Sequence, residues 1–394
     1  MDCLFGGNLK NKDKEKNENN DILSPFDRTP PRSPTVKSPS GIQFIPKDEV
    51  TRTFNSPKGV VGNNIDEHTK RLNERGYEVK SLLGKGTFGQ CYDVIKSSDG
   101  SRLAVKIMNL GEFQKDDKLF QDFSNEVWIL SQTPHINIIG LVDHFMYDGM
   151  YTFIVLEFAN GETLDKWVKN SSAPLTEYKA KIYFFQMSRA IDHLHRQGIA
   201  HRDIKLNNTL VHTLSNGKQV IKVADFGLSR VSYKSNYGTV MMSKPVGTMV
   251  FMSPQVLILY TARLTKTPLV GQRVEPFSAD IWSLGICLYF MLDQRYPFED
   301  TDQFRYGNKK DKQVKAIVSR KMYKKMIRHE WTLPQQNLSK ECHHLLEDTL
   351  EVNCDKRIQI SGIVRNMWFD EWLNGEKVVD INQIDLLKFL DKYD

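Results

Sequence analysis

The sequence contains few cysteines and no long apolar run, and each of these features excludes some classes of protein. Its five cysteines are odd in number, widely separated and in no metal-ligand spacing. The longest apolar stretch, from Ile281 to Leu292, is interrupted by Ser283 and is shorter than the roughly 20 residues that span a bilayer. A secretory signal pattern is also missing. We therefore expect no membrane span, and a reducing compartment: the cytoplasm, the nucleus or both.

The chain also lacks a strong excess of charge. A net charge of +6 over 394 residues is too small to indicate nucleic acid as a partner, and we expect none. With 40% hydrophobic and 26% charged residues, the composition excludes a wholly disordered or fibrous protein. The length allows two or three ordinary domains or one large two-lobed domain.

Residues 1–75 differ in composition from the rest. They contain seven of the fifteen prolines and few large apolar side chains, so they cannot bury enough surface to offset the entropy lost on ordering. We predict a disordered tail. It holds five Ser/Thr-Pro pairs, which begin at Ser24, Thr29, Ser33, Ser38 and Ser56. A phosphorylated regulatory tail and a solvated segment that proline keeps unstructured are both compatible with this pattern.

From Tyr77 onward the pattern is that of a folded domain. Short β-rich runs occur at 77–83, 90–95, 103–108, 138–145 and 151–158. A helical pattern covers 116–131, between the third and the fourth of these runs, and the chain after residue 158 is largely helical. The sequence therefore predicts a small sheet-rich lobe followed by a larger helical lobe.

A glycine-rich segment, Gly84-Lys85-Gly86-Thr-Phe-Gly89, connects the first two predicted strands. Glycines at these positions let backbone amides approach phosphates closely. Dinucleotide-binding folds have similar glycines, but there a helix follows, whereas here a strand follows. Lys106 comes next, in an apolar strand, with Glu126 on the following helix as a possible ion-pair partner. By itself Lys106 would be a strand-edge lysine with its head in solvent.

Two later motifs decide the interpretation. His201-Arg-Asp203-Ile-Lys205-Leu-Asn-Asn208 is followed by Asp225-Phe-Gly227, and with the glycines and Lys106 they stand in the order and spacing of protein kinases. The chain resembles a eukaryotic protein kinase from about Tyr77 to Phe369. The resemblance implies an α+β, two-lobed fold: a small antiparallel-sheet lobe with one helix at 76–158 and a larger, mainly helical lobe at 159–369. A short tail, 370–394, would follow.

The resemblance implies ATP and Mg²⁺ as cofactors and gives each motif residue a role. Lys106 would hold the α- and β-phosphates, with Glu126 keeping its ammonium in place. Asp203 would accept or orient the proton of the substrate hydroxyl, while Lys205 would steady the transferring phosphate. The two implied metal ligands are Asn208 and Asp225, both hard oxygen ligands suited to Mg²⁺.

The same resemblance places the adenine. Cys91, Ala104 and Leu210 would enclose it, with Cys91 standing where valine is usual. The backbone of Glu157 to Ala159 would bond its edge, and Leu156 would be the gatekeeper.

An apolar stack would link the helix of Glu126 to the catalytic loop, and Asp280 would anchor that stack from below. Its implied members are Leu130, Leu141, His201 and Phe226.

The substrate class follows from Lys205 and from Gly247-Thr248 before Ser253-Pro254, which resemble serine/threonine kinases. Leu338–Cys342 and Lys356-Arg357-Ile358 look most like the calcium/calmodulin-dependent and AMP-activated kinase branch. We expect transfer of the ATP γ-phosphate to Ser/Thr hydroxyls of proteins in intracellular signalling. A small-molecule kinase is the alternative enzyme, although it needs no peptide platform such as 247–254.

A scaffold without activity is the third hypothesis. It draws support from Gln255, which replaces a glutamate that in the family pairs with an arginine equivalent to Arg357, and from two insertions, at 261–275 and 302–322. A glutamine would give that arginine one neutral hydrogen bond instead of an ion pair, and this predicts a less firmly anchored activation segment.

Three regulatory expectations remain. Arg202 precedes Asp203, as in kinases whose activation segment is ordered by a phosphate, so an upstream kinase would act on Ser243 or Thr239. The basic segment 302–328 is either a solvated helical face packed on the large lobe, which we favour, or a dock for an acidic partner. Its spacing would also suit a calmodulin-type or membrane-surface helix. In the C-terminal tail, the residues that would pack on the domain are Ile384, Leu387 and Leu390.

Peptide specificity rests on three positions where arginine-directed relatives carry carboxylates. Here they are Asn207, Thr163, with Glu162 one residue away, and Phe290. We therefore expect no strong requirement for arginine two or three residues before the target hydroxyl, and an apolar contact from Phe290 instead.

Overall fold

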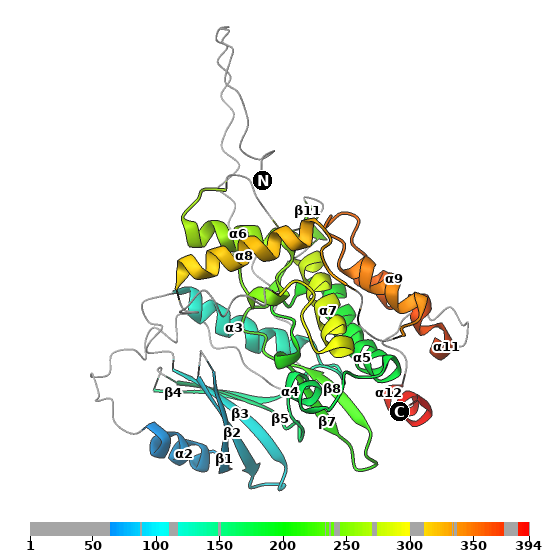
Figure 1. The fold of residues 1–394 in the computed structure, drawn as a ribbon. Coiled ribbons are helices and arrows are strands. Elements are labelled where there is room, and N and C mark those ends of the chain that lie inside the picture. The colour runs from blue at the N-terminus through cyan, green and yellow to red at the C-terminus, as the bar shows by residue number, and fades with distance from the viewer. Residues whose placement is uncertain are drawn as a thin grey trace, which may run out of the picture. The chain divides into compact units, whose positions relative to one another are not determined.

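The computed structural model of the chain describes residues 64–86, 89–109, 117–148, 151–232, 234–235, 238–239, 245–269, 274–299, 311–332, 334, 337–373 and 385–393. The five Ser/Thr-Pro pairs and Ser243 lie outside the described residues. Figure 1 shows a twisted sheet with helices, followed along the chain by a largely helical part.

A five-stranded antiparallel sheet forms the first part of the domain, in the order β1-β2-β3-β5-β4. Its strands are β1 (Tyr77–Gly86), β2 (Gly89–Lys96), β3 (Arg102–Asn109), β4 (Leu141–Tyr147) and β5 (Tyr151–Glu157). Side chains alternate along β3, so Leu103, Val105 and Ile107 enter the core while Ala104 and Lys106 are on the opposite face. This alternation turns Lys106 away from the apolar core.

The expected elements of this part are present, with boundaries that differ by up to three residues. The helix predicted at 116–131 is α3, Asp117–Gln132. The strand expected from residue 138 begins at Leu141, because Ile138 forms only an isolated bridge with Val223.

The prediction of a disordered tail is wrong for its last residues, which form the helix α2 (Asn64–Glu74). Leu72 is fully buried in the cluster of the sheet, and His68 lies edge-on to the Tyr151 ring at 4.8 Å. The Arg71 guanidinium lies 3.7 Å from the centre of the Tyr147 ring. Packing on the sheet supplies the burial that the local composition alone could not indicate.

The helical part is built on α5 (Glu177–Arg196) and α7 (Pro276–Asp293), which contact each other and are almost entirely buried. The remaining helices are α4 (Leu164–Asn170), α6 (Pro254–Thr265), α8 (Lys312–Ile327), α9 (Lys340–Thr349), α10 (Ile360–Ile363), α11 (Asp370–Leu373) and α12 (Leu386–Tyr393). Short strands are β6 (Ile199–Ala200), β7 (Thr209–Thr213), β8 (Gln219–Val223), β9 (Arg230–Val231), β10 (Lys234–Ser235) and β11 (Gly238–Thr239). Of the helices described, none is both long enough and apolar enough to cross a membrane.

The described part of the basic segment contains the helix α8, which packs on the helical part, as favoured from the sequence, whereas residues 302–310 lie outside the described residues. α8 lies beside α6 (Figure 1), and the Thr261 hydroxyl donates to the Ser319 hydroxyl at 2.8 Å between them. Met322 and Met326 of α8 are buried in the core.

The C-terminal tail also packs on the domain, but not entirely with the expected side chains. Phe389 of α12 stacks on Phe185 of α5 at 4.8 Å, and Leu386 and Leu390 are buried. Leu387 is 47% exposed, because it lies on the opposite face of α12. Ile384 lies outside the described residues.

Candidate active site

Three charged side chains from three distant elements converge beside the sheet. Lys106 on β3 donates to both carboxylate oxygens of Glu126 on α3, at 2.7 and 3.0 Å. The same ammonium donates to Asp225 at 3.2 Å. The predicted partnership of Lys106 with Glu126 is therefore present, and Asp225 joins it from the loop after β8.

Mutual attraction keeps Lys106 and Asp225 charged. Burial disfavours the charged form of Lys106, but the carboxylates of Glu126 and Asp225 outweigh it and raise the pKa of Lys106. Burial also opposes ionisation of Asp225, but the neighbouring Lys106 charge prevails and the pKa of Asp225 is lowered. Asp225 is therefore an ionised carboxylate at neutral pH, with 44% of its side chain exposed.

A second group lies in the loop between β6 and β7. Asp203 accepts from Lys205 at 2.6 Å and from the Asn208 amide at 2.9 Å, both at its Oδ2 atom. Asn208 also donates to the Asp203 carbonyl at 3.0 Å. Because the amide nitrogen of Asn208 is used in this way, its amide oxygen is the atom left to face a cation.

The loop is held from beneath by one buried carboxylate on α7. Asp280 accepts from the backbone amides of His201 and Arg202, each at 2.8 Å, and contacts His195 at 2.9 Å. Arg202 and Asp225 both have left-handed backbones, with φ values of 66° and 64°. Such strain in residues other than glycine persists only where the surroundings impose it, and it is common at active sites.

Comparison of the sequence with known proteins shows the family of the chain. A sequence profile of the protein kinase domain covers residues 77–369, well over half of the chain. The chain belongs to the protein kinase family.

Similar proteins include kinases of plants and of a slime mould. The "Probable serine/threonine-protein kinase fhkD" of Dictyostelium discoideum is 31% identical over 78% of this chain and 38% of its own length. CBL-interacting serine/threonine-protein kinase 5 of Arabidopsis thaliana is 30% identical over 77% of this chain and 60% of its own. CBL-interacting protein kinase 16 of Oryza sativa subsp. japonica is 29% identical, over 77% and 59%. This kinase thus spans less than two thirds of the length of these relatives.

The residues expected to enclose the adenine lie on strands of both parts of the domain. Cys91 on β2 pairs with Lys106, and Ala104 on β3 pairs with Leu156 on β5. Leu210, half-buried on β7, forms a bridge with Thr163. Burial raises the pKa of the Cys91 thiol to about 11, so this side chain is a small neutral contact at neutral pH.

The chain segment after β5 offers a free backbone group for the adenine edge. Within the described chain, the amide of Ala159 takes part in no hydrogen bond. The Glu157 side chain is engaged elsewhere, because it accepts from Lys222 at 2.7 Å and from the Gly140 amide at 2.8 Å. Glu157 therefore fixes the segment that presents Ala159.

Close packing on β3 accounts for one glycine of the glycine-rich segment. Gly86 pairs with Gly89 at the turn between β1 and β2, and Gly84 pairs with Cys91. A Cβ at Gly89 would collide with the carbonyl oxygen of Ile107, whereas one at Gly84 would meet open space. Close backbone approach therefore explains glycine at position 89 but not at position 84.

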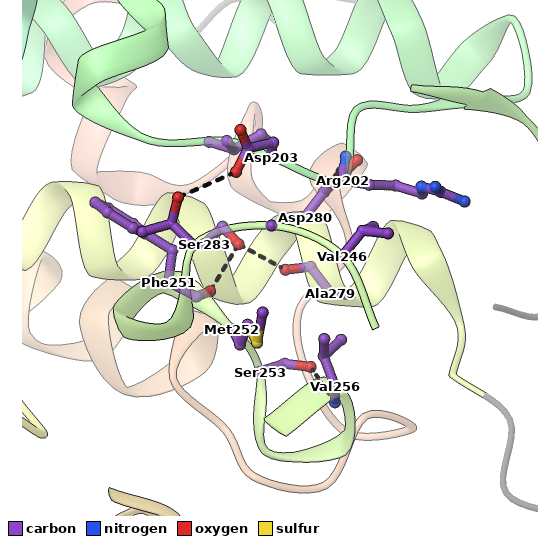
Figure 2. A pocket seen from close by; sticks show the side chains of 13 residues that line it. Arg202, Asp203, Val246, Phe251, Met252, Ser253, Val256, Ala279, Asp280 and Ser283 are labelled. Carbon is purple, nitrogen blue, oxygen red and sulfur yellow. Dashed lines mark hydrogen bonds between the residues drawn. The ribbon is translucent and has the colours of Figure 1, made fainter. Parts of the chain in front are cut away.

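Sequence reasoning treated Thr248 as a marker of substrate class and missed its contact with the catalytic loop. Its hydroxyl accepts from Lys205 at 3.1 Å and lies 3.5 Å from Asp203 Oδ1. Figure 2 shows the small cavity beside these groups, where Arg202 extends away from Asp203. Its volume of about 20 Å³ has room for roughly one water molecule.

The adjacent glycine explains how the two segments come so close. Gly247 has a φ of 100°, and a Cβ there would lie 3.0 Å from the Arg202 carbonyl oxygen. The Gly-Thr pair noted in the sequence was therefore the signal, but its contact partner was not readable from spacing.

The expected apolar stack is also in place. Leu130 and Phe226 belong to the main core cluster, Leu141 packs against it, and the rings of His201 and Phe226 are 5.0 Å apart. Asp280 lies beneath His201, as expected.

Two expectations on peptide contacts need correction or refinement. Phe290 cannot offer an apolar contact to a substrate, because it is only 2% exposed and packs on Tyr296 at 4.6 Å. Thr163 is the N-cap of α4, whereas its neighbour Glu162 is exposed and is the acidic group at this position. Asn207 is exposed, as its assigned position requires.

Proposed function

We propose that this kinase is an active serine/threonine protein kinase, which transfers the γ-phosphate of ATP to protein hydroxyls. The observation that carries the proposal is the trio of Lys106, Glu126 and Asp225, set beside the bonded group of Asp203 and Asn208. Phosphoryl transfer needs positioned charge more than covalent chemistry, and these residues supply positioned charge.

Asp225 and the amide oxygen of Asn208 fit Mg²⁺, which is usually held by one or two protein oxygens together with phosphates. Bound Mg²⁺ would neutralise phosphate charge. In the described part of the chain no three or more His, Cys, Asp or Glu side chains gather as a metal site, in keeping with a metal held largely by its substrate. Lys106 would hold the α- and β-phosphates, oriented by Glu126.

Asp203 would orient the acceptor hydroxyl and take up its proton. Its Oδ2 atom already accepts two hydrogen bonds, from Lys205 and Asn208, while the Oδ1 atom has only the long contact with Thr248. The hydroxyl would therefore meet Oδ1. Lys205 would steady the transferring phosphate from a position between Asp203 and Thr248.

A protein rather than a small metabolite is the proposed substrate, because 247–254 form a platform directly against the catalytic loop. The relatives named as serine/threonine kinases support hydroxyl acceptors. For regulation, we propose an upstream kinase that acts on Ser243 or Thr239. Arg202 supports this, since its buried Nε atom has no hydrogen-bond partner among the described residues. A cytoplasmic or nuclear, reducing location is proposed from the described cysteines, all of which are free.

A radioactive assay tests the proposal. The wild-type chain should incorporate ³²P from γ-labelled ATP and Mg²⁺ into a generic protein substrate, and Asp225→Ala should not. Equal incorporation by both would mean that the signal comes from a contaminant and that the proposed roles are wrong. Binding of ATP without transfer by the wild type would favour the scaffold hypothesis.

A further inference from the structure

The helix α8 concentrates positive charge on one face of the molecule. Residues 312–328 contain seven Lys or Arg and no Asp or Glu, whereas the whole chain has a net charge of only +6. The neighbouring helix α6 adds Arg263 and likewise has no acidic residue. The catalytic and nucleotide-binding groups described above do not include this surface.

The exposed face of α8 is mixed rather than purely basic. Ile317, Arg320, Lys324 and Ile327 follow one another at spacings of three or four residues and form the α8 stripe. Ile317 is 42% and Ile327 37% exposed, which places them among the few large apolar side chains that the described residues leave open. The α8 stripe therefore combines positive charge with apolar surface.

Several basic side chains of α8 have no carboxylate partner in the part of the chain that the structure describes. Among the described residues, Lys312, Lys315, Arg320 and Lys324 form no ion pair with a carboxylate. Arg320 and Lys324, and then Lys324 and Arg328, are like charges four residues apart, an arrangement that destabilises a helix. Lys312 and Lys315 lie in the first turn, where positive charge opposes the helix dipole. An external anion beside Arg320 and Lys324 would relieve the repulsion between these two charges.

We propose that the α8 stripe docks an acidic, amphipathic segment of a partner protein. Ile317 and Ile327 are ten residues apart, so about 15 Å of helix separates them, with Arg320 and Lys324 in between. The complementary segment would present two apolar side chains at that distance, with carboxylates between them. An anionic membrane is disfavoured, because the larger apolar face of α8 is already buried against the domain.

Fluorescence anisotropy tests this directly. The probe is a labelled peptide of 18 residues, designed as a helix with two leucines ten positions apart and glutamates between them. Arg320→Glu/Lys324→Glu should raise its Kd by about 10-fold or more. Lys356→Glu/Arg365→Glu makes the same charge change at exposed residues elsewhere and should alter the Kd less than about twofold.

An apolar variant and a kinase assay complete the design. Ile317→Ala/Ile327→Ala leaves the charge unchanged and should raise the Kd by several-fold. Phosphorylation of a short generic peptide should be the same in all variants, so failure of the docking proposal is separate from failure of the proposed activity. Circular dichroism would verify that each variant is folded.

Three results would overturn the proposal. The first is no binding of the peptide by the wild-type chain. The second is equal loss in the two charge-reversed variants, which indicates non-specific attraction. The third is binding of phosphatidylserine vesicles, but not of the peptide, that depends on the α8 stripe; it would assign the surface to a membrane.

Discussion

Replacing Lys106 by methionine removes one charge from the site while keeping a side chain of similar length. A unit charge about 4 Å from a phosphate oxygen is worth about 4 kcal/mol at an effective dielectric constant of about 20. Since each 1.4 kcal/mol or so is a factor of ten in rate, phosphoryl transfer should fall about 10³-fold. The 3.2 Å contact between Lys106 and Asp225 places the lost charge directly beside the proposed metal ligand.

The same substitution also has a cost in stability that can be separated from activity. It leaves the carboxylate of Glu126, which is 3% exposed, without a cation. Breaking a buried ion pair from one side costs about 3 kcal/mol or more. The double variant Lys106→Met/Glu126→Gln removes the unpaired charge, so it should regain most of the stability but none of the activity.

Initial rates of ³²P transfer at saturating ATP, together with unfolding midpoints, would measure both effects. Lys181→Met is the matched control, since Lys181 is a buried lysine on α5 that lies over the Trp372 ring, 4.6 Å from its centre. It should retain activity close to that of the wild type. If Lys106→Met keeps a rate within tenfold of the wild type, with Asp225→Ala as the blank, then the role assigned to the ammonium is wrong.

Three further predictions concern the carboxylate beneath the catalytic loop and the packing of the helices α2 and α12. Asp280→Asn leaves one side-chain oxygen to accept hydrogen bonds from two backbone amides. In steady-state kinetics, kcat should therefore fall by up to about 10²-fold while the KM for ATP is unchanged. An unchanged kcat would contradict this role of Asp280. Burial lowers the pKa of His68 from its usual 6.5. The contribution of neutral His68 to the stability of α2 is therefore complete above pH 6.5 and is lost as the pH falls below 6.5. Protection of the α2 amides in hydrogen exchange should decline over the same range. His68→Phe should abolish that decline, and its persistence would point to another group. Phe389→Ala removes the stack on Phe185 and should cost about 3 kcal/mol in the free energy of chemical unfolding while kcat is kept; unchanged stability would show that α12 does not contribute to the fold.

The reacting groups could be predicted from the sequence because their chemistry fixes residue types at short spacing. Asp203 and Asn208 are five residues apart in one loop, and their hydrogen bonds follow from that loop alone. Lys106 and Asp225 are 119 residues apart, so their contact was predictable only through the order of the motifs. Thr248 shows what the sequence could not predict. The Gly247-Thr248 pair was recognised in the sequence, but the hydrogen bond between Thr248 and Lys205 depends on tertiary folding.

The errors arose where burial depends on the partner surface rather than on the local sequence. α2 lies in a polar, proline-rich stretch, and only the sheet beneath Leu72 makes it a stable helix. Phe290 was assigned because it matches a position where arginine-directed relatives carry a carboxylate, yet its helix α7 is buried on nearly all sides. Spacing identifies which residue occupies a position, but packing decides whether that residue meets a substrate or the core.

Gln255 departs from the family pattern, in which a glutamate pairs with the arginine equivalent to Arg357. Its amide oxygen accepts from Arg357 at 3.1 Å and its amide nitrogen donates to the Val352 carbonyl at 2.6 Å, so the single neutral hydrogen bond expected for that arginine is present. Burial lowers the pKa of Arg357 to about 10, and the guanidinium makes four other hydrogen bonds, to Ser278 and to the carbonyls of Glu351 and Val352. A buried cation whose donors are all satisfied does not need a carboxylate, and a buried ion pair often adds little net stability. Gln255 was one of two features that favoured an inactive scaffold, and its bonds to Arg357 and Val352 are compatible with an intact activation segment and with catalysis.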